Sequence, residues 1–404
     1  METALRVAAG VIGAIGLILL FESLARAVLI PHPVMSLFTR ATRVVAQAYI
    51  SLVARRGFGY HRQHRLLSGL GPLLVLGTLF VAVVGIGVTY ALLTYALSPV
   101  TAKEATYQAG SALLTLGLLE TENPPEVAVA FLAAFTGMAL IAVLIGYLLA
   151  LFTSYTGRET MVTKSSLWAG EPSWGPELLC RRRLSGAGPM DPLTEGWIDW
   201  VCEVRSSHIQ YPVLSYFRSA SATRGWLNAL LARLDAAALE IAVTVNRNEG
   251  DCASLLAEGS QTFRVLRTHL ESRRKLEHGP PHPTEERPTA ALDHRSRALY
   301  HAIRTDGRRA TWHRKRNPES RRQSSITRPE FDHACELMSR VGIELRSDRD
   351  AAFHRFLELR SAYEFNAYRA AERIHAVPAP WSGPRRGGIP TLWPTLSATF
   401  VDPE

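Results

Sequence analysis

Cysteine is scarce in this chain, because the 404 residues contain four, at widely separated positions. No two of them form a C-x-x-C pair, the spacing typical of zinc knuckles. So few scattered cysteines also exclude a scaffold that disulfide bonds stabilise. Buried, reduced thiols are expected instead, as in a cytoplasmic domain. The four positions are Cys180, Cys202, Cys252 and Cys335.

Recognised catalytic motifs are also absent from the sequence. It contains no phosphate-binding loop, no G-x-S-x-G nucleophile motif, no H-E-x-x-H zinc motif and no convincing pair of carboxylates. Histidines recur between residues 278 and 313, but without the spacing of metal ligands. The sequence therefore predicts no enzyme activity, no cofactor and no metal site.

Charge is rare in the first 156 residues, which hold nine of the 45 basic and six of the 36 acidic side chains. The same region contains three long apolar runs, at residues 7–30, 71–97 and 126–155. A helix needs roughly 20 apolar residues to cross a hydrocarbon core. The sequence therefore predicts an all-α membrane protein with three transmembrane helices, followed by a helical, water-soluble domain.

The loops between these runs predict the orientation. Residues 31–70 carry six arginines and no acid, whereas residues 98–125 carry one lysine and three glutamates. By the positive-inside rule, the N-terminus lies outside and the C-terminal domain is cytoplasmic, which places the chain in the cell (inner) membrane. The first run ends in Ala25-Arg26-Ala27, which resembles a signal-peptidase site. An uncleaved anchor is expected because the run is long and a basic flank follows it, and cleavage is the alternative.

The basic segment 31–70 contains an amphipathic stretch at residues 34–56, with apolar side chains at helical spacing. We expect a helix that lies in the inner membrane interface, and a tilted fourth crossing is the alternative. Its arginines are expected to contact anionic lipid headgroups. These are Arg40, Arg43, Arg55 and Arg56.

A short half-polar stretch separates the second and third runs. Residues 102–114 have a helix-forming composition, but such a helix rises only about 20 Å, which is too short to cross. Thr115-Leu116-Gly117 then breaks the helix, and Asn123-Pro124-Pro125 turns the chain toward the next run. This order predicts a re-entrant pore helix and loop. A plain external hairpin with a surface helix is the alternative.

Residues 71–156 resemble the two-helix pore module of the potassium-channel superfamily, with an outer helix, a pore helix, a Thr-x-Gly stretch, an acid and an inner helix. The whole chain resembles actinobacterial proteins labelled potassium-channel or two-pore-domain-channel family proteins. The motifs that carry this second resemblance are "GYLLALFTSYTGRE", "GEPSWGPELL", "YPVLSYFRS" and "PAPWS". Against the filter motif T-V-G-Y-G-D, the chain reads Thr115, Leu116, Gly117, Leu118, Leu119 and Glu120.

The resemblance implies a homotetrameric cation channel, with potassium as the expected ion among monovalent cations. Backbone carbonyls of residues 115–117 would form the rings that replace the water of an ion, and Gly117 is free to adopt a positive φ. Glu120 and Glu122 would either concentrate cations at the external mouth or be solvated loop charges. Gly137 occupies the position of an inner-helix hinge, and simple helix packing explains it equally well.

The outer half of the loop departs from the filter motif. Leu118 replaces the tyrosine, and Leu119 replaces the second glycine, where a left-handed conformation costs a side chain about 1 to 2 kcal/mol. These two leucines argue against strict potassium selectivity and are consistent with a shortened, weakly selective or non-conducting pore. The alternative function is a non-conducting oligomeric anchor or sensor, which keeps the pore fold and signals through its cytoplasmic domain.

The remaining sequence divides into a helical domain at 157–274, a basic insertion rich in Pro, Arg and His at 275–326, and a helical part with a Pro/Gly-rich tail at 327–404. The basic insertion is expected to be solvated, and no nucleic-acid partner is predicted. Capping-box spacing is present at Thr327 with Glu330 and at Ser347 with Asp350, the latter with Asp in place of Glu. Five tryptophans are expected in the core, namely Trp168, Trp174, Trp197, Trp200 and Trp226.

Overall fold

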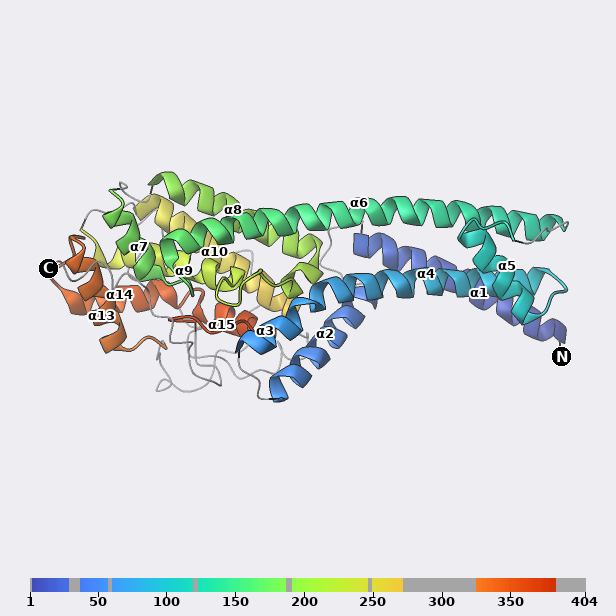
Figure 1. Ribbon diagram of the computed structural model, residues 1–404, viewed down its shortest axis with the longest axis horizontal. Coiled ribbons are helices and arrows are strands. Elements are labelled where there is room, and N and C mark those ends of the chain that lie inside the picture. Colours follow the sequence, from blue (N-terminus) through green and yellow to red (C-terminus); the bar gives the residue numbers. More distant parts are fainter. Residues whose placement is uncertain are drawn as a thin grey trace, which may run out of the picture. The chain divides into compact units, whose positions relative to one another are not determined.

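The computed structural model of the chain describes residues 2–28, 37–56, 60–118, 123–186, 191–245, 249–271 and 325–382 (Figure 1). The regular elements among these residues are all helices, and the only extended pairing among them is one isolated bridge between Thr244 and Leu345. The all-α fold class predicted from the sequence is confirmed. The chain divides into two units, of which the first comprises Met1–Ala48, Gly69–Tyr155 and Gln210–Leu214.

Three of the described helices are long and apolar enough to cross a membrane. They are α1 (Glu2–Val28), α4 (Leu70–Leu97), which follows the short α3 (Tyr60–Ser68), and α6 (Pro124–Ala169). Each begins close to a predicted apolar run, and α6 continues beyond residue 155, where that run ends. The amphipathic helix α2 (Leu37–Arg55) is not among them.

Helices α1 and α4 run antiparallel (Figure 1), and glycines of α1 lie at their contact. A Cβ atom placed on Gly10 would lie 3.0 Å from Cβ of Ala96, and one on Gly13 would lie 3.0 Å from the carbonyl oxygen of Thr89. Gly16 continues this stripe at the same spacing of three residues. Between apolar helices, small residues of this kind allow backbones to approach closely and gain van der Waals contact.

Arg6 fixes the end of α4 against α1. Its guanidinium donates to the carbonyl oxygens of Tyr95, at 2.9 Å, and of Ser98, and it lies 4.7 Å from the centre of the Tyr95 ring. The last carbonyls of a helix have no partner within the helix and carry its negative end. The arginine satisfies both needs, so α4 ends in a defined position.

The second unit is organised around α9 (Trp226–Val243), in which every residue is buried. A helix that is mainly apolar on all sides is expected at the centre of a bundle. Helices α7, α10, α14 and α15 all contact α9, and α13 packs on α7. The other elements are α7 (Gly175–Leu184), α8 (Asp191–Gln210), η1 (Pro212–Tyr216), α10 (Glu249–Leu270), α13 (Arg328–Arg340), α14 (Arg349–Arg360) and α15 (Glu364–Arg373).

Most details predicted for this unit are confirmed. Four of the five tryptophans are buried, and Trp168 is half-buried. Three of the four free cysteines are buried, and Cys202 is partly exposed. The backbone N–H of Thr327 donates to Glu330 at 2.7 Å, as the capping-box spacing predicts. The cap predicted at Ser347 is wrong by one residue, because the carboxylate of Asp348 accepts from the N–H of Ala351 at 2.9 Å.

Other predicted features differ or lie elsewhere. Apolar residues at helical spacing predict one helix at residues 348–375 and another at 292–308. The first of these stretches is two helices, because the chain turns at residues 361–363. The stretch 292–308 lies outside the described residues, as do nearly all of the insertion and most of the Pro/Gly-rich tail.

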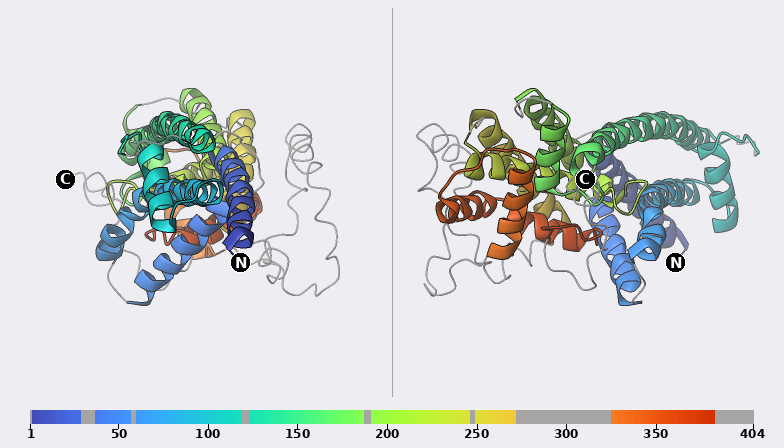
Figure 2. Two further views of the ribbon diagram at one scale, coloured as in Figure 1. Left: turned by 90° about the vertical axis from the view of Figure 1, so that its right-hand side faces the viewer. Right: turned by 60° about the vertical axis from the view of Figure 1, so that its left-hand side comes forward.

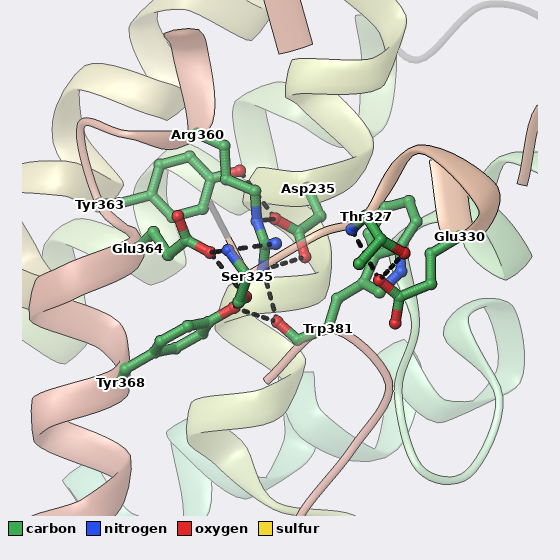
Figure 3. A network of polar contacts seen from close by, with 9 residues as sticks. All are labelled: Asp235, Ser325, Thr327, Glu330, Arg360, Tyr363, Glu364, Tyr368 and Trp381. Carbon is green, nitrogen blue, oxygen red and sulfur yellow. Dashed lines mark hydrogen bonds and ion pairs between the residues drawn. The ribbon is translucent and has the colours of Figure 1, made fainter. Parts of the chain in front are cut away.

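A buried ionic network joins α9 to α14 and α15 (Figure 3). Arg360 lies 3.0 Å from a carboxylate oxygen of Asp235 and 3.5 Å from one of Glu364, and all three side chains are almost completely buried. The hydroxyl of Tyr363 also donates to Asp235 at 2.8 Å. Burial raises the pKa of Asp235 to about 6, although the charge of Arg360 opposes this rise. One cation therefore serves two buried carboxylates.

We expect Arg360→Met to destabilise the second unit by about 3 to 5 kcal/mol, because it leaves two buried carboxylates without a cation. The matched control is Arg328→Met, whose ion pairs with Asp332 and Asp350 are largely exposed, so its loss should cost about 0 to 1 kcal/mol. Denaturation of the purified full-length chain, followed by tryptophan fluorescence, measures both. Equal effects of the two substitutions would contradict the importance of the network.

Candidate functional site: the loop after helix α5

Helix α5 (Ala102–Leu113) lies between the ends of α4 and α6, and its start is fixed by a capping box (Figures 1 and 2). The carboxylate of Glu104 accepts from the backbone N–H of Thr101 at 2.9 Å. In return, the N–H of Glu104 donates to the hydroxyl of Thr101 at 3.3 Å. This exchange satisfies two of the free donors at a helix start. The helix therefore begins at residue 102, where the helix-forming composition predicts its start.

The end of α5 is a complete Schellman motif. The N–H of Leu116 donates to the carbonyl of Ser111 at 2.8 Å, and the N–H of Thr115 donates to that of Ala112 at 3.0 Å. These are the two reverse hydrogen bonds that define the motif. The hydroxyl of Ser111 also accepts from the N–H of Leu118 at 2.9 Å, which holds the chain after the turn. One serine therefore holds both the turn and the segment that follows.

Two residues of the loop have left-handed backbone conformations. Thr115 has φ 55° and Gly117 has φ 64°, whereas Leu116 between them lies outside this region. Gly117 adopts its conformation without steric cost, as predicted. Thr115 occupies the position that usually holds glycine in a Schellman motif, and a β-branched side chain there is strained by about 1 to 2 kcal/mol. Such strain is typical of sites where a particular side chain is needed.

The end of α5 rests directly on α6. A Cβ atom placed on Gly137 would lie only 1.9 Å from the carbonyl oxygen of Leu113, so no residue other than glycine fits without movement of the backbone. The side chain of Leu113 packs on the other side against Gly87 of α4. Leu113 is therefore held between α4 and α6, in the core of the first unit.

A polar contact within this core ties α4 to α6 at the same level. The hydroxyl of Tyr90 lies 2.7 Å from that of Thr136 and also donates to the carbonyl of Leu132 at 3.3 Å. Both side chains are buried. Thr136 directly precedes Gly137 in the sequence. The contact therefore fixes the part of α6 against which the end of α5 packs.

The described residues cover part of the predicted site. Thr115, Leu116, Gly117 and Leu118 are all exposed in the single chain, and Gly137 is buried beneath the end of α5. Leu119, Glu120 and Glu122 lie outside the described residues. Sequence reasoning missed Ser111, Tyr90 and Thr136. Only Ser111 left a signal, as a hydroxyl near the end of a predicted helix and next to the filter-like letters.

Helix α2 carries the other predicted contact surface. Val44, Val45 and Leu52 are exposed on it by 65%, 56% and 49%, which is unusual for large apolar side chains at helical spacing. Arg40 and Arg55 are exposed near its two ends. The helix therefore presents an apolar stripe that is flanked by positive charge.

Known proteins give no guide to the site, because no family model, no curated protein and no solved structure matches this chain. Among the described residues, no group of three or more His, Cys, Asp or Glu side chains is placed to hold a metal ion.

Gly137→Ala is expected to lower the midpoint of thermal unfolding of the purified protein, because the added methyl group must displace the carbonyl of Leu113. Overpacking of this kind costs about 1 to 3 kcal/mol. Gly146→Ala is the matched control on the same helix, since a Cβ atom there meets nothing within 4 Å. That change should stabilise α6 by up to about 1 kcal/mol. A Gly137→Ala protein as stable as the Gly146→Ala protein would disprove the contact.

Thr115→Gly should raise the same midpoint, because glycine adopts the left-handed conformation without strain. The expected gain is about 1 kcal/mol. Thermal unfolding of the variant beside the wild type measures it. A loss of stability would mean that contacts of the threonine side chain outweigh the strain of its backbone.

Proposed function

We propose that the chain is one subunit of a homotetrameric, potassium-channel-like cation channel, with its pore module at residues 71–156. The observation that carries the proposal is the conformation between α4 and α6. A helix of 12 residues ends in a strained turn that rests on a glycine of α6, and the returning chain has left-handed residues at 115 and 117.

The dimensions of α5 support a re-entrant segment. Its 12 residues rise about 18 Å, far less than the roughly 30 Å of a hydrocarbon core. Non-helical backbone is tolerated at membrane depth only where protein buries it or where it lines a water-filled path. The C-terminal end of α5, which carries the negative end of the helix dipole, would face the ion path.

The loop conformation supports a filter made of carbonyl oxygens. In an extended strand, consecutive carbonyls point to opposite sides, so that only every second one would face an ion. Left-handed residues at alternate positions interrupt that pattern in Thr115-Leu116-Gly117. A ring of oxygens needs this loop from four chains, which is why a homotetramer is part of the proposal. Glu120 and Glu122 would concentrate cations at the outer mouth.

The proposal includes an orientation and a lipid contact. The C-terminal unit is cytoplasmic and the N-terminus is external, because the arginine-rich segment 31–70 stays on the inner side of the cell membrane. The apolar stripe of α2 lies in the inner interface. Its arginines contact anionic headgroups there, namely Arg40, Arg43, Arg55 and Arg56.

A second candidate function is a non-conducting oligomeric anchor that signals or binds through the C-terminal unit. The exposed side chains of the loop favour it. Leu114, Leu116 and Leu118 are exposed by 55%, 57% and 54%, and apolar side chains around a pore mouth are poor neighbours for a hydrated ion. In this case the loop would pack against other copies of itself and leave no open path.

Flux of potassium from liposomes that contain the purified protein separates the two functions. For a channel, Thr115→Ala and Gly117→Ala should each change the flux by at least about tenfold, which corresponds to about 1.4 kcal/mol in the barrier. Thr106→Ala, a matched change on the exposed surface of α5, should leave the flux unaltered.

Native mass spectrometry of the same preparation provides the control on assembly. A tetramer without flux under all tested gating conditions would favour the anchor. A monomer would contradict both functions.

A further inference from the structure

A groove of about 350 Å³ lies between α5 and α6, beside the loop of the candidate site. Its size is at the lower end of the range for small-molecule sites in proteins. Small apolar side chains from both helices leave this space open, because none of them reaches across it. They are Ala109, Ala112, Val129, Ala130 and Ala134.

One carboxylate gives the groove its charge. Glu126 lines it with only 8% of its surface exposed, and its carboxylate accepts from the neutral amide of Asn123 at 3.3 Å. Glu126 lies in the first turn of α6, where the positive end of the helix dipole favours an anionic side chain. Among the described residues that line the groove, none is basic.

A second acceptor faces no donor. Gln108 also lines the groove, and its side-chain oxygen Oε1 is buried without a hydrogen-bond partner among the described residues. A buried acceptor without a partner is costly, and a bound group that donates a hydrogen bond to it would remove that cost. The groove therefore offers a negative charge, an unsatisfied oxygen and an apolar wall.

We propose that this groove binds an amphiphilic cation, namely an ammonium group attached to an alkyl chain. The ammonium donates to the carboxylate of Glu126 and to Oε1 of Gln108, since it has three donors and no acceptor. The alkyl chain lies along the alanines and Val129. A free alkylamine and the amine headgroup of a lipid share this chemistry. The site is built from one chain and does not depend on ion conduction.

Isothermal titration of the purified full-length protein in neutral maltoside micelles tests the proposal, with n-octylammonium as the probe and 1-octanol as its uncharged match. Titration into empty micelles corrects for partition of both. We expect one octylammonium per chain, bound about 10- to 100-fold more tightly than octanol, the usual range for hydrogen bonds to a charged group. Shortening the probe to n-hexylammonium should weaken binding about fourfold per methylene.

Two substitutions test the charge of the carboxylate and the size of the groove separately. Glu126→Gln should reduce the preference for octylammonium over octanol at least tenfold, while octanol still binds. Ala134→Leu fills the groove and should weaken both probes. Ala142→Leu is the matched control, because residue 142 is exposed on the same helix and outside the groove.

Vesicles then distinguish the natural source of the ligand. If lipid is the source, phosphatidylethanolamine vesicles should raise the thermal midpoint of the wild type more than phosphatidylglycerol vesicles do, and Glu126→Gln should abolish the difference. If a free amine is the source, octylammonium alone produces the shift.

Two results would overturn the proposal. One is equal affinity of the wild type for octylammonium and octanol. The other is a Glu126→Gln protein that keeps the full preference for octylammonium over octanol. If that variant does not fold, unchanged binding of both probes to Ala134→Leu would also contradict the proposal.

Discussion

The contact between the carbonyl of Leu113 and the backbone at Gly137 is the constraint on which the candidate site depends. It sets the height and tilt of α5, because the end of that helix has no space to move toward α6. The Schellman turn, the left-handed Thr115 and the groove beside Glu126 all follow from where α5 ends. Tyr90 and Thr136 then keep α4 and α6 in register beneath it.

The second unit solves a different problem, which is how to bury charge in the middle of a bundle. Arg360 neutralises Asp235 and Glu364, but Arg233 on the same central helix has no carboxylate partner among the described residues. Its guanidinium instead stacks 4.2 Å from the centre of the Trp200 ring and donates to the carbonyl of Met161 at 2.9 Å. Stacking on an aromatic face suits arginine, because its planar cation is weakly hydrated. Met161 belongs to α6, so the far end of that long helix is fixed within the core of the second unit.

The sequence was sufficient for features that depend on nearby residues. Apolar runs predicted the long helices, the capping box of Thr327 predicted a helix start, and the positive φ of Gly117 followed from its lack of a side chain. The left-handed Thr115 was not predictable, because the intrinsic preference of a β-branched residue opposes it and the Schellman hydrogen bonds override that preference. The sequence fits either a hinge or close packing at Gly137, because its partner Leu113 is distant in sequence. The structure shows close packing there, and a hinge role stays a prediction.

The glycine stripe of α1 has a consequence for synthesis. The surface that receives Gly10, Gly13 and Gly16 belongs to α4, and a ribosome makes that surface only after α1 and the whole arginine-rich segment have emerged. Until then α1 has no surface of α4 to pack against. If both helices cross a membrane, as their length and apolar composition allow, α1 would have to be stable there before α4 is made, and the two would then associate through their matching surfaces.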